Sequence, residues 1–410
     1  MQAVTYQKPY TIVVEKVPIP ELIESTDVIV KVIVSGLCGS DLHVYRHHEE
    51  RLDKGTIMGH EFVGVVDKKG LDVKNLDIGD RVLSPFTTNC GECFYCTRGI
   101  TCRCDKGKLY GWIAKGEGIH GAQTEYVRVP LADSTLVKCP EKISNIEALL
   151  AGDVFSTGLF CAENGIGNLS AIEREQSVIV VLGCGPVGLM SIVSAIHLGA
   201  KNVLAVDSIG ERLQLAKDYG AMTVINFLNE DVYEMIKGIT DTRGADVVLE
   251  AVGNNKALEL AFKILRPAGI ISSVGVHSGK VFPFSPEDGY NKNVTYKSGR
   301  CPARHMITKT LPLLEAKKYN VEKIVSHRFK LCDAVHGYTI FEQHLEGYSI
   351  PSSSSTPSIN DNNINFSNSR RSKKVKEIEL FENKSLAKTK RKQPIECEEN
   401  PQQLLTTKIV

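Results

Sequence analysis

Val178-Ile179-Val180-Val181-Leu182-Gly183-Cys184-Gly185-Pro186-Val187-Gly188 is the stretch that decides the fold. An apolar run leads directly into the pattern Gly-x-Gly-x-x-Gly, and the apolar stretch 189–198 follows it. A buried strand, a glycine turn and a helix in this order are typical of the first turn of a dinucleotide-binding sheet. The glycines permit a tight turn and close approach to a pyrophosphate, whose charge the helix amino end can bind through its N–H groups.

Asp207 supports this interpretation because it ends the next apolar run, 19 residues after Gly188. A carboxylate there can accept hydrogen bonds from the adenosine ribose, and it would repel a 2'-phosphate, so we expect NAD rather than NADP. Arg212 follows within the next helical stretch and is either a second cofactor contact or an ordinary helix-surface charge. The expected cofactor loop consists of Gly183, Gly185, Pro186, Val187 and Gly188.

The order of apolar runs and helical stretches around this loop predicts an α/β fold. Short apolar runs separated by helical stretches predict a doubly wound parallel sheet with helices on both faces. Before them, β-branched runs between Thr11 and Val66 alternate with Gly, Pro and Asp and predict a β-rich domain. No internal repeat is visible. The expected parallel strands are Val178–Leu182, Val203–Asp207, Val224–Ile225, Asp246–Glu250 and Ile270–Val274.

Cysteines are concentrated between Cys90 and Cys104, where five of the 12 lie. Cys90, Cys93, Cys96 and Cys104 have the spacing C-x2-C-x2-C-x7-C, which favours a closed tetrahedral zinc site of structural type. Cys102 also lies within reach, and spacing alone leaves it open as the fourth ligand. Such a site can hold a loop that is too small to have its own apolar core.

Charge and hydropathy limit the remaining classes. The 410 residues carry a formal net charge of +1, and the basic excess lies after residue 350, so the body shows no nucleic-acid signature. No run approaches the roughly 20 apolar residues of a membrane span, and no signal peptide is visible, so we expect a cytoplasmic protein without a membrane partner. Basic clusters at 370–374 and 388–392 leave nuclear targeting open. We expect a disordered tail over residues 348–410.

The chain resembles the zinc-containing medium-chain alcohol dehydrogenases. The resemblance runs from near the N-terminus to about Gly347 and implies a GroES-like catalytic domain at residues 1–153, with a structural-zinc lobe at 88–108. It further implies a Rossmann NAD-binding domain at 154–300, a return segment at 301–347 and a homo-oligomer. It is carried by residues 36–43, 59–61, 79–82, 155–158 and 183–188 together with the four cysteines.

This resemblance implies that Cys38, His60 and Asp153 bind a catalytic zinc whose fourth position takes water or substrate. Asp153 resembles the glutathione-independent formaldehyde dehydrogenases and fungal zinc-type members, whereas many relatives have Cys there and polyol dehydrogenases have Glu. Glu61 is implied as an alternate ligand, and Asp41 as a group that orients His60. Ser40 and His43 match the proton relay, although His43 is open to interpretation as a surface histidine.

The implied chemistry is hydride transfer between an alcohol or aldehyde and NAD, with two zinc ions per subunit. A polyol or diol dehydrogenase and a catalytically retired dinucleotide-binding protein are the alternatives. One departure is that the family's last apolar strand is missing after Gly347, so the domain is truncated or the reading frame has shifted. The residues implied to line the nicotinamide, which buried strand packing would explain equally well, are Val252, Val274, Gly275 and Val276.

Overall fold

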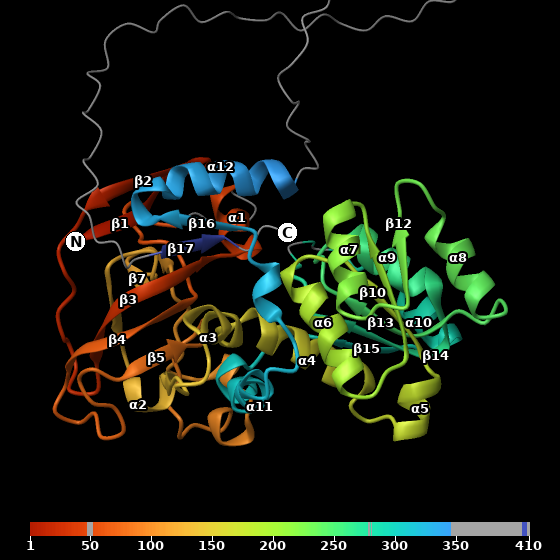
Figure 1. The fold of residues 1–410 in the computed structure, drawn as a ribbon, viewed down its shortest axis with the longest axis horizontal. Helices are drawn as coiled ribbons and strands as arrows, with labels where there is room; N and C mark the ends of the chain where they lie inside the picture. The colour runs from red at the N-terminus through yellow and green to blue at the C-terminus, as the bar shows by residue number, and fades with distance from the viewer. Residues whose placement is uncertain (47–51, 278, 280, 346–403, 408–410) are drawn as a thin grey trace, which may run out of the picture.

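The computed structural model describes residues 1–46, 52–277, 279, 281–345 and 404–407. They form two lobes that lie side by side: a β-rich lobe built from both ends of the chain and an α/β lobe built from its middle (Figure 1). The predicted combination of a doubly wound parallel sheet with a β-rich domain is confirmed.

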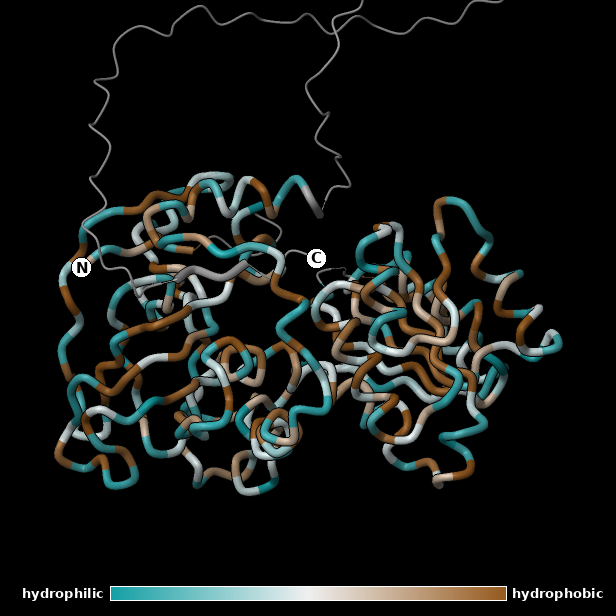
Figure 2. The backbone as a smooth tube through the Cα atoms, viewed as in Figure 1, coloured by the Kyte–Doolittle hydropathy of each residue, from teal (hydrophilic) through white to brown (hydrophobic). Residues whose placement is uncertain are grey.

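The α/β lobe contains a six-stranded parallel sheet in the order β12-β11-β10-β13-β14-β15. The order reverses beside β10, and ligands of such sheets bind at this reversal, outside the carboxyl ends of the strands. The apolar residues of the central strands form the brown interior of this lobe in Figure 2. The strands are β10 (Val178–Leu182), β11 (Asn202–Asp207), β12 (Thr223–Asn226), β13 (Ala245–Glu250), β14 (Leu265–Ser273) and β15 (Thr295–Ser298).

The helices between these strands follow the predicted alternation. They are α6 (Pro186–His197), α7 (Gly210–Asp218), α8 (Val232–Ile239), α9 (Asn255–Ile264) and α10 (Pro286–Lys292), and α5 (Ala171–Gln176) precedes the first of the strands. The five predicted strands are present, and the largest difference is that β14 begins five residues before Ile270. Ala268 has a φ of 55° within this extension, an irregularity that the apolar pattern does not reveal.

The β-rich lobe contains a seven-stranded sheet in the order β16-β17-β3-β4-β5-β9, with β8 paired to β3. Two small antiparallel pairs, β1 with β2 and β6 with β7, flank it. The strands are β1 (Gln2–Lys8), β2 (Thr11–Lys16), β3 (Val28–Leu37), β4 (Phe62–Lys69), β5 (Arg81–Ser84), β6 (Trp112–Ala114), β7 (Glu117–Ile119), β8 (Tyr126–Val129), β9 (Val137–Lys138), β16 (His327–Lys330) and β17 (Leu404–Thr407).

Two helices join the lobes. α4 (Val154–Ile166) meets α6 so closely at Gly158 that a β-carbon there would lie 2.6 Å from the backbone of Met190. α11 (Ala303–Glu315) lies against α4, where Ser156 and Thr310 are 3.4 Å apart. One buried cluster runs from Val34 in the β-rich sheet to Val181 in the parallel sheet, so the lobes share a core. The other helical elements are α1 (Gly39–Tyr45), α2 (Ala132–Thr135), α3 (Asn145–Gly152), α12 (Ala334–Leu345), η1 (Cys96–Arg98), η2 (Thr101–Arg103), η3 (Val321–Ile324) and η4 (Leu331–Asp333).

β17 comes from the far end of the chain, where the sequence had predicted disorder. It pairs antiparallel with β16 and parallel with β3, with Leu404 opposite both Lys330 and Val34. The expected disorder is therefore wrong for these four residues, which add a strand to the β-rich sheet (Figure 1). The other residues of the expected tail, including both basic clusters, lie outside the described residues. Among the described residues, no helix is long and apolar enough to cross a membrane.

Candidate active site and metal centres

Four side chains from three separate segments converge at one end of the β-rich sheet. Cys38 lies between β3 and α1, His60 and Glu61 directly precede β4, and Asp153 lies between α3 and α4. Their ligand atoms all lie within 4.8 Å of one another. The structure thus brings together the three zinc ligands implied by the resemblance and the implied alternate ligand.

Short contacts fix His60 within this cluster. Its Nδ1 lies 3.2 Å from Asp41, and its Nε2 lies 3.6 Å from the Asp153 carboxylate. The backbone N–H of Cys38 donates to the other oxygen of Asp41 at 2.9 Å. Asp41 therefore links two of the converging residues and leaves Nε2 of His60 directed at the third. This is the orienting position expected for Asp41.

Burial and charge make this cluster suited to a dication. His60 is 8% exposed and Glu61 is 1% exposed. Burial raises the pKa of the Cys38 thiol, and the nearby carboxylates of Glu61 and Asp153 raise it further. Burial lowers the pKa of His60, but Asp41 and Asp153 outweigh it and hold that pKa well above its usual value. A thiolate and a carboxylate with a neutral imidazole balance the charge of Zn²⁺ and offer ligand types that zinc accepts.

The packing around Glu61 depends on a glycine. A β-carbon at Gly36 would lie 2.3 Å from the Glu61 carboxylate, so any larger residue on β3 would push this side chain away. The Gly36 N–H also donates to the Glu61 carbonyl at 3.0 Å. Glu61 is thus held beside the other three by close contact between β3 and the residue that precedes β4.

Ser40 touches two members of the cluster. Its hydroxyl lies 3.3 Å from the Cys38 sulfur and 3.2 Å from Nε2 of His60. His43 is half-buried and lies three residues further along α1, outside the group of four ligand residues.

Thr157 is a member of this site that was not predicted from the sequence. Its hydroxyl donates to the Asp153 carboxylate at 2.9 Å, and its backbone N–H donates to the Asp153 carbonyl at 2.7 Å. The available signal was the spacing of four residues at the start of a helix, which brings two side chains together.

The cysteine lobe forms a second group. The sulfur atoms of Cys90, Cys93, Cys96 and Cys104 lie within 4.8 Å of one another, and Cys102 is not among them. The N–H groups of Cys90 and Cys93 donate to the sulfurs of Cys104 and Cys90, at 3.2 and 3.4 Å. Backbone hydrogen bonds from Asp105 and Cys96 lower the pKa of the Cys93 thiol to about 6. The geometry therefore groups Cys104, and not Cys102, with the other three sulfurs.

The glycine loop after β10 has the tight geometry that a phosphate site requires. Gly183 has a φ of 85°, and a β-carbon at Gly188 would lie 1.7 Å from the Gly183 carbonyl oxygen. Gly185 precedes α6 with Pro186 in its first turn, and a β-carbon there would meet no atom within 4 Å. The amino end of α6 is thus open where the pyrophosphate is expected.

Asp207 ends β11 beside this loop and is largely committed to the backbone. One carboxylate oxygen accepts from the N–H of Cys184 at 2.7 Å, and the other accepts from Ser208 and Ile209 at 2.7 and 3.0 Å. Arg212 lies 3.9 Å from the first oxygen and is 8% exposed, so it is a buried neighbour of Asp207 rather than a helix-surface charge.

The residues expected to line the nicotinamide come from two adjacent loops. Gly275 packs so closely on the other loop that a β-carbon there would lie 2.2 Å from the Gly253 nitrogen. Val252 and Val276 flank this contact and are 42% and 44% exposed. Exposed apolar side chains at the carboxyl edge of the sheet fit the apolar face of a nicotinamide ring.

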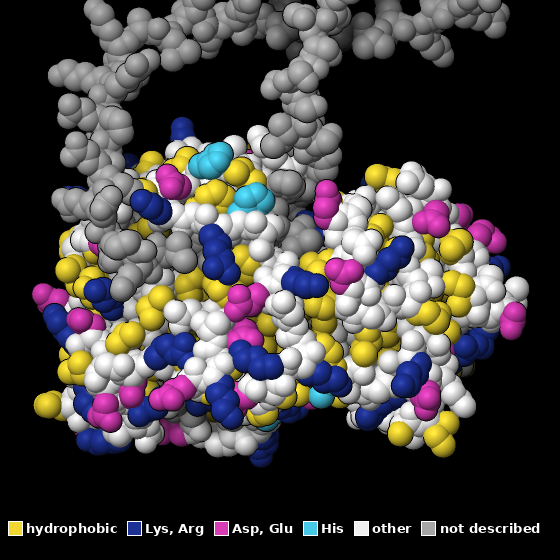
Figure 3. Space-filling model, viewed as in Figure 1, with side chains coloured by type: hydrophobic (Ala, Val, Ile, Leu, Met, Phe, Trp, Pro, Cys, Tyr) yellow, Lys and Arg dark blue, Asp and Glu magenta, His cyan; other side chains and the backbone are white. Residues whose placement is uncertain are grey.

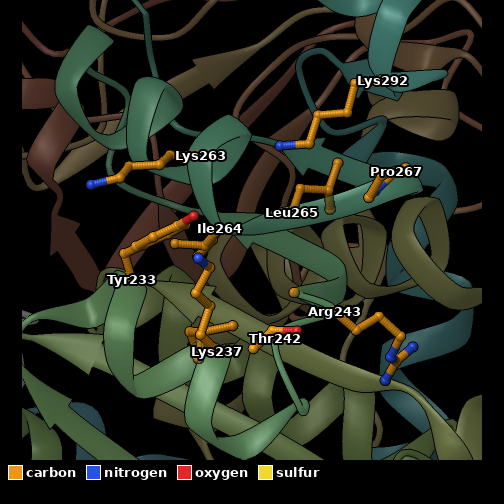
Figure 4. Close-up of a pocket in the computed structure, with 11 residues that line it drawn as sticks. Tyr233, Lys237, Thr242, Arg243, Lys263, Ile264, Leu265, Pro267 and Lys292 are labelled. Carbon is orange, nitrogen blue, oxygen red and sulfur yellow. The ribbon is translucent and has the colours of Figure 1, made fainter.

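A cavity of about 200 Å³ lies at the opposite edge of the parallel sheet (Figure 4). Lys237, Lys263 and Lys292 line it from the last turns of α8, α9 and α10. Lysines in these places complement the negative carboxyl ends of helices, which is reason enough for their presence. The cavity has none of the site residues on its wall.

Figure 3 shows both signs of charge interspersed over the visible face.

Two family models match the chain. The model described as "Alcohol dehydrogenase GroES-like domain" matches residues 24–141, and that described as "Zinc-binding dehydrogenase" matches residues 186–316. "Zinc-type alcohol dehydrogenase B" of Aspergillus flavus is 42% identical over 343 residues, covering 83% of this chain and 78% of that protein.

Solved structures agree with these matches. An alcohol dehydrogenase from Thermus sp. ATN1 superposes with a TM-score of 0.76 at 37% identity, over 84% of this chain and 97% of that one. An alcohol dehydrogenase from Escherichia coli CFT073, complexed with NADH, superposes with a TM-score of 0.70 at 26% identity, over 83% of this chain and 95% of that one.

Proposed function

The chain belongs to the zinc-dependent alcohol dehydrogenase family and is a zinc-dependent oxidoreductase, and on this premise we propose that it transfers hydride between a small alcohol or aldehyde and NAD. The catalytic zinc ligands in this proposal are Cys38, His60 and Asp153. The observation that carries the proposal is the convergence of these three side chains, with Glu61, within 4.8 Å. A dinucleotide loop alone would also suit a retired binding protein, which would not need this cluster.

Zinc bound there would act as a Lewis acid on the substrate oxygen, and NAD would accept the hydride. The chain's own part is to position and to move a proton. Asp41 and Thr157 orient His60 and Asp153, and Ser40 is close enough to the cluster to accept the hydroxyl proton of the substrate. His43 is our proposal for the next group in that relay. Glu61 is our proposal for an alternate ligand when the substrate leaves.

The nucleotide is proposed to bind along the carboxyl edge of the parallel sheet. The open amino end of α6 would take the pyrophosphate, with Gly183, Gly185 and Gly188 giving room for it. Asp207 still has acceptor capacity beside three backbone donors, and its charge supports NAD over NADP. Arg212 would lie near the same ribose, and Val252, Val274, Gly275 and Val276 near the nicotinamide.

The other assignments are proposals of the same kind. The four-cysteine lobe would hold a structural zinc, so that each chain binds two ions. We propose the domain bounds 1–153, 154–300 and 301–347, a homo-oligomer, and a cytoplasmic location, with small molecules rather than nucleic acids or membranes as partners.

The test is to measure zinc per chain and the reduction of NAD and NADP with formaldehyde, primary alcohols, secondary alcohols and polyols. Asp153→Asn should lower kcat/KM at least about 100-fold, since a Lewis acid contributes several kcal/mol to such a transition state. Asp153→Cys should retain more activity than Asp153→Asn because it restores an anionic ligand. Asp67→Asn, an exposed change on β4, is the control. Full activity of the Asp153→Asn protein would refute the assignment, and preferred turnover of polyols would move the substrate class.

A further inference from the structure

Glu250 ends β13 at the same edge of the sheet as the glycine loop and is completely buried. From the sequence, this residue is only the end of an expected strand. Burial raises the pKa of this carboxyl, but hydrogen bonds from His277, Ser273 and Gly253 outweigh burial and leave that pKa below its ordinary value. A buried carboxylate that stays ionised needs several donors, and their origin indicates its role.

Two backbone donors belong to the loop that follows β13. One carboxylate oxygen accepts from the N–H groups of Val252 and Gly253, at 2.8 and 2.6 Å. The bonds hold the turn in which Gly253 adopts a φ of 85°.

The other oxygen is bound by Ser273, the last residue of β14, and by the loop that follows it. It accepts from the Ser273 hydroxyl at 2.6 Å and lies 3.0 Å from Nε2 of His277. Ser273 and His277 also lie 3.0 Å from each other. The Glu250 carbonyl accepts from the N–H of Val274 at 3.0 Å. One residue therefore binds both loops.

Each loop carries one of the exposed valines described above, Val252 and Val276. The loops touch backbone to backbone, since a β-carbon at Gly253 would lie 2.6 Å from the Val276 nitrogen. Their relative position is set by this contact and by the Glu250 carboxylate. A shift of one loop against the other would separate the two valines.

We propose that Glu250, with Ser273 and His277, is a positioning residue that fixes these two loops as one apolar support for the nicotinamide ring. The inference rests on the proposed function, because it concerns the cofactor assigned there. An amide could not replace the carboxylate without loss. Gln at this position keeps one acceptor oxygen for the first loop, but its NH2 group would face the donors of the second.

The test compares Glu250→Gln with Glu259→Gln, an exposed change on α9 in the same domain. We expect NADH, followed by its fluorescence, to bind Glu250→Gln about tenfold more weakly, as for loss of a charged hydrogen bond. In the zinc-loaded enzyme the KM for NAD should rise while the KM for the alcohol stays unchanged. A merely structural role would lower the active fraction and leave both constants as they are.

Ser273→Ala and His277→Asn test the proposal in case Glu250→Gln fails to fold, because each removes only one hydrogen bond to the second carboxylate oxygen of Glu250. Each should weaken NADH binding about threefold to tenfold. Without cofactor, amide hydrogen exchange over residues 274–277 should accelerate in all three variants. Wild-type affinity for NADH in the three variants, together with unchanged exchange, would overturn this inference alone. If the wild-type chain bound no NADH, the proposed function would fall and the inference with it.

Discussion

Replacing Cys104 by serine should release one zinc ion and loosen the cysteine lobe. The lobe has little apolar core of its own, because Phe94, Tyr95 and Ile100 are 58%, 37% and 42% exposed. Its order must therefore come mainly from the four sulfurs and the ion they would hold. A structural zinc site contributes about 10 kcal/mol or more to folding in small domains. Loss of one thiolate should cost the lobe about 3 kcal/mol at least, or roughly 100-fold in local opening.

Cys102→Ser is the matched control, since Cys102 lies in the same lobe outside the group of four sulfurs. Zinc content by elemental analysis should fall from about two to about one per chain in Cys104→Ser and stay unchanged in Cys102→Ser. Amide exchange over residues 90–104 should accelerate about 100-fold only in the first variant. The reverse pattern, with zinc lost from Cys102→Ser and retained in Cys104→Ser, would refute the ligand assignment.

Three further predictions concern other parts of the molecule. Ending the chain at Gly347 removes β17 from between β3 and β16 and should lower the free energy of unfolding by about 2 to 4 kcal/mol, as measured by thermal unfolding. Replacing residues 351–400 by a Gly/Ser segment of equal length should leave that free energy nearly unchanged. Equal stability of the two variants would contradict a stabilising role of β17. Gly188→Ala should weaken NADH binding at least about tenfold, because the added methyl group would force the Gly183 carbonyl out of the turn. Gly238→Ala in α8 is the control, since a methyl group there would meet no atom. Asp246 has a lowered pKa, because Arg266 at 2.6 Å and the Val178 N–H at 2.8 Å outweigh the opposing effect of burial. The contribution of its carboxylate to stability is therefore present above about pH 4 and is lost as the pH falls through the pKa of the folded state. Asp246→Asn should flatten that acid limb of the stability curve, and an unchanged acid limb would argue against this ion pair.

Features whose parts lie close together in the chain could be predicted from the sequence by itself. The turn from Gly183 to Gly188 requires glycines within six residues, and the cysteine lobe gathers its sulfurs within fifteen. Likewise, alternation of apolar runs with helical stretches determined the parallel sheet, because side-chain periodicity reports local structure and burial directly. For Cys38, His60 and Asp153, the sequence supplied residue types, and only the resemblance to a family related them.

The tertiary structure decided what depends on distant segments meeting. It brought Asp153 to His60 across more than ninety residues, and the path of the lobe backbone placed Cys104 rather than Cys102 beside the other three cysteines. It also placed Leu404–Thr407 between β3 and β16, although the polar stretch before them predicts no structure. The Glu250 network joins two loops in the same way. Local pattern cannot determine such contacts, because their free energy comes from burial and hydrogen bonding between elements whose approach is set by the packing of the whole core.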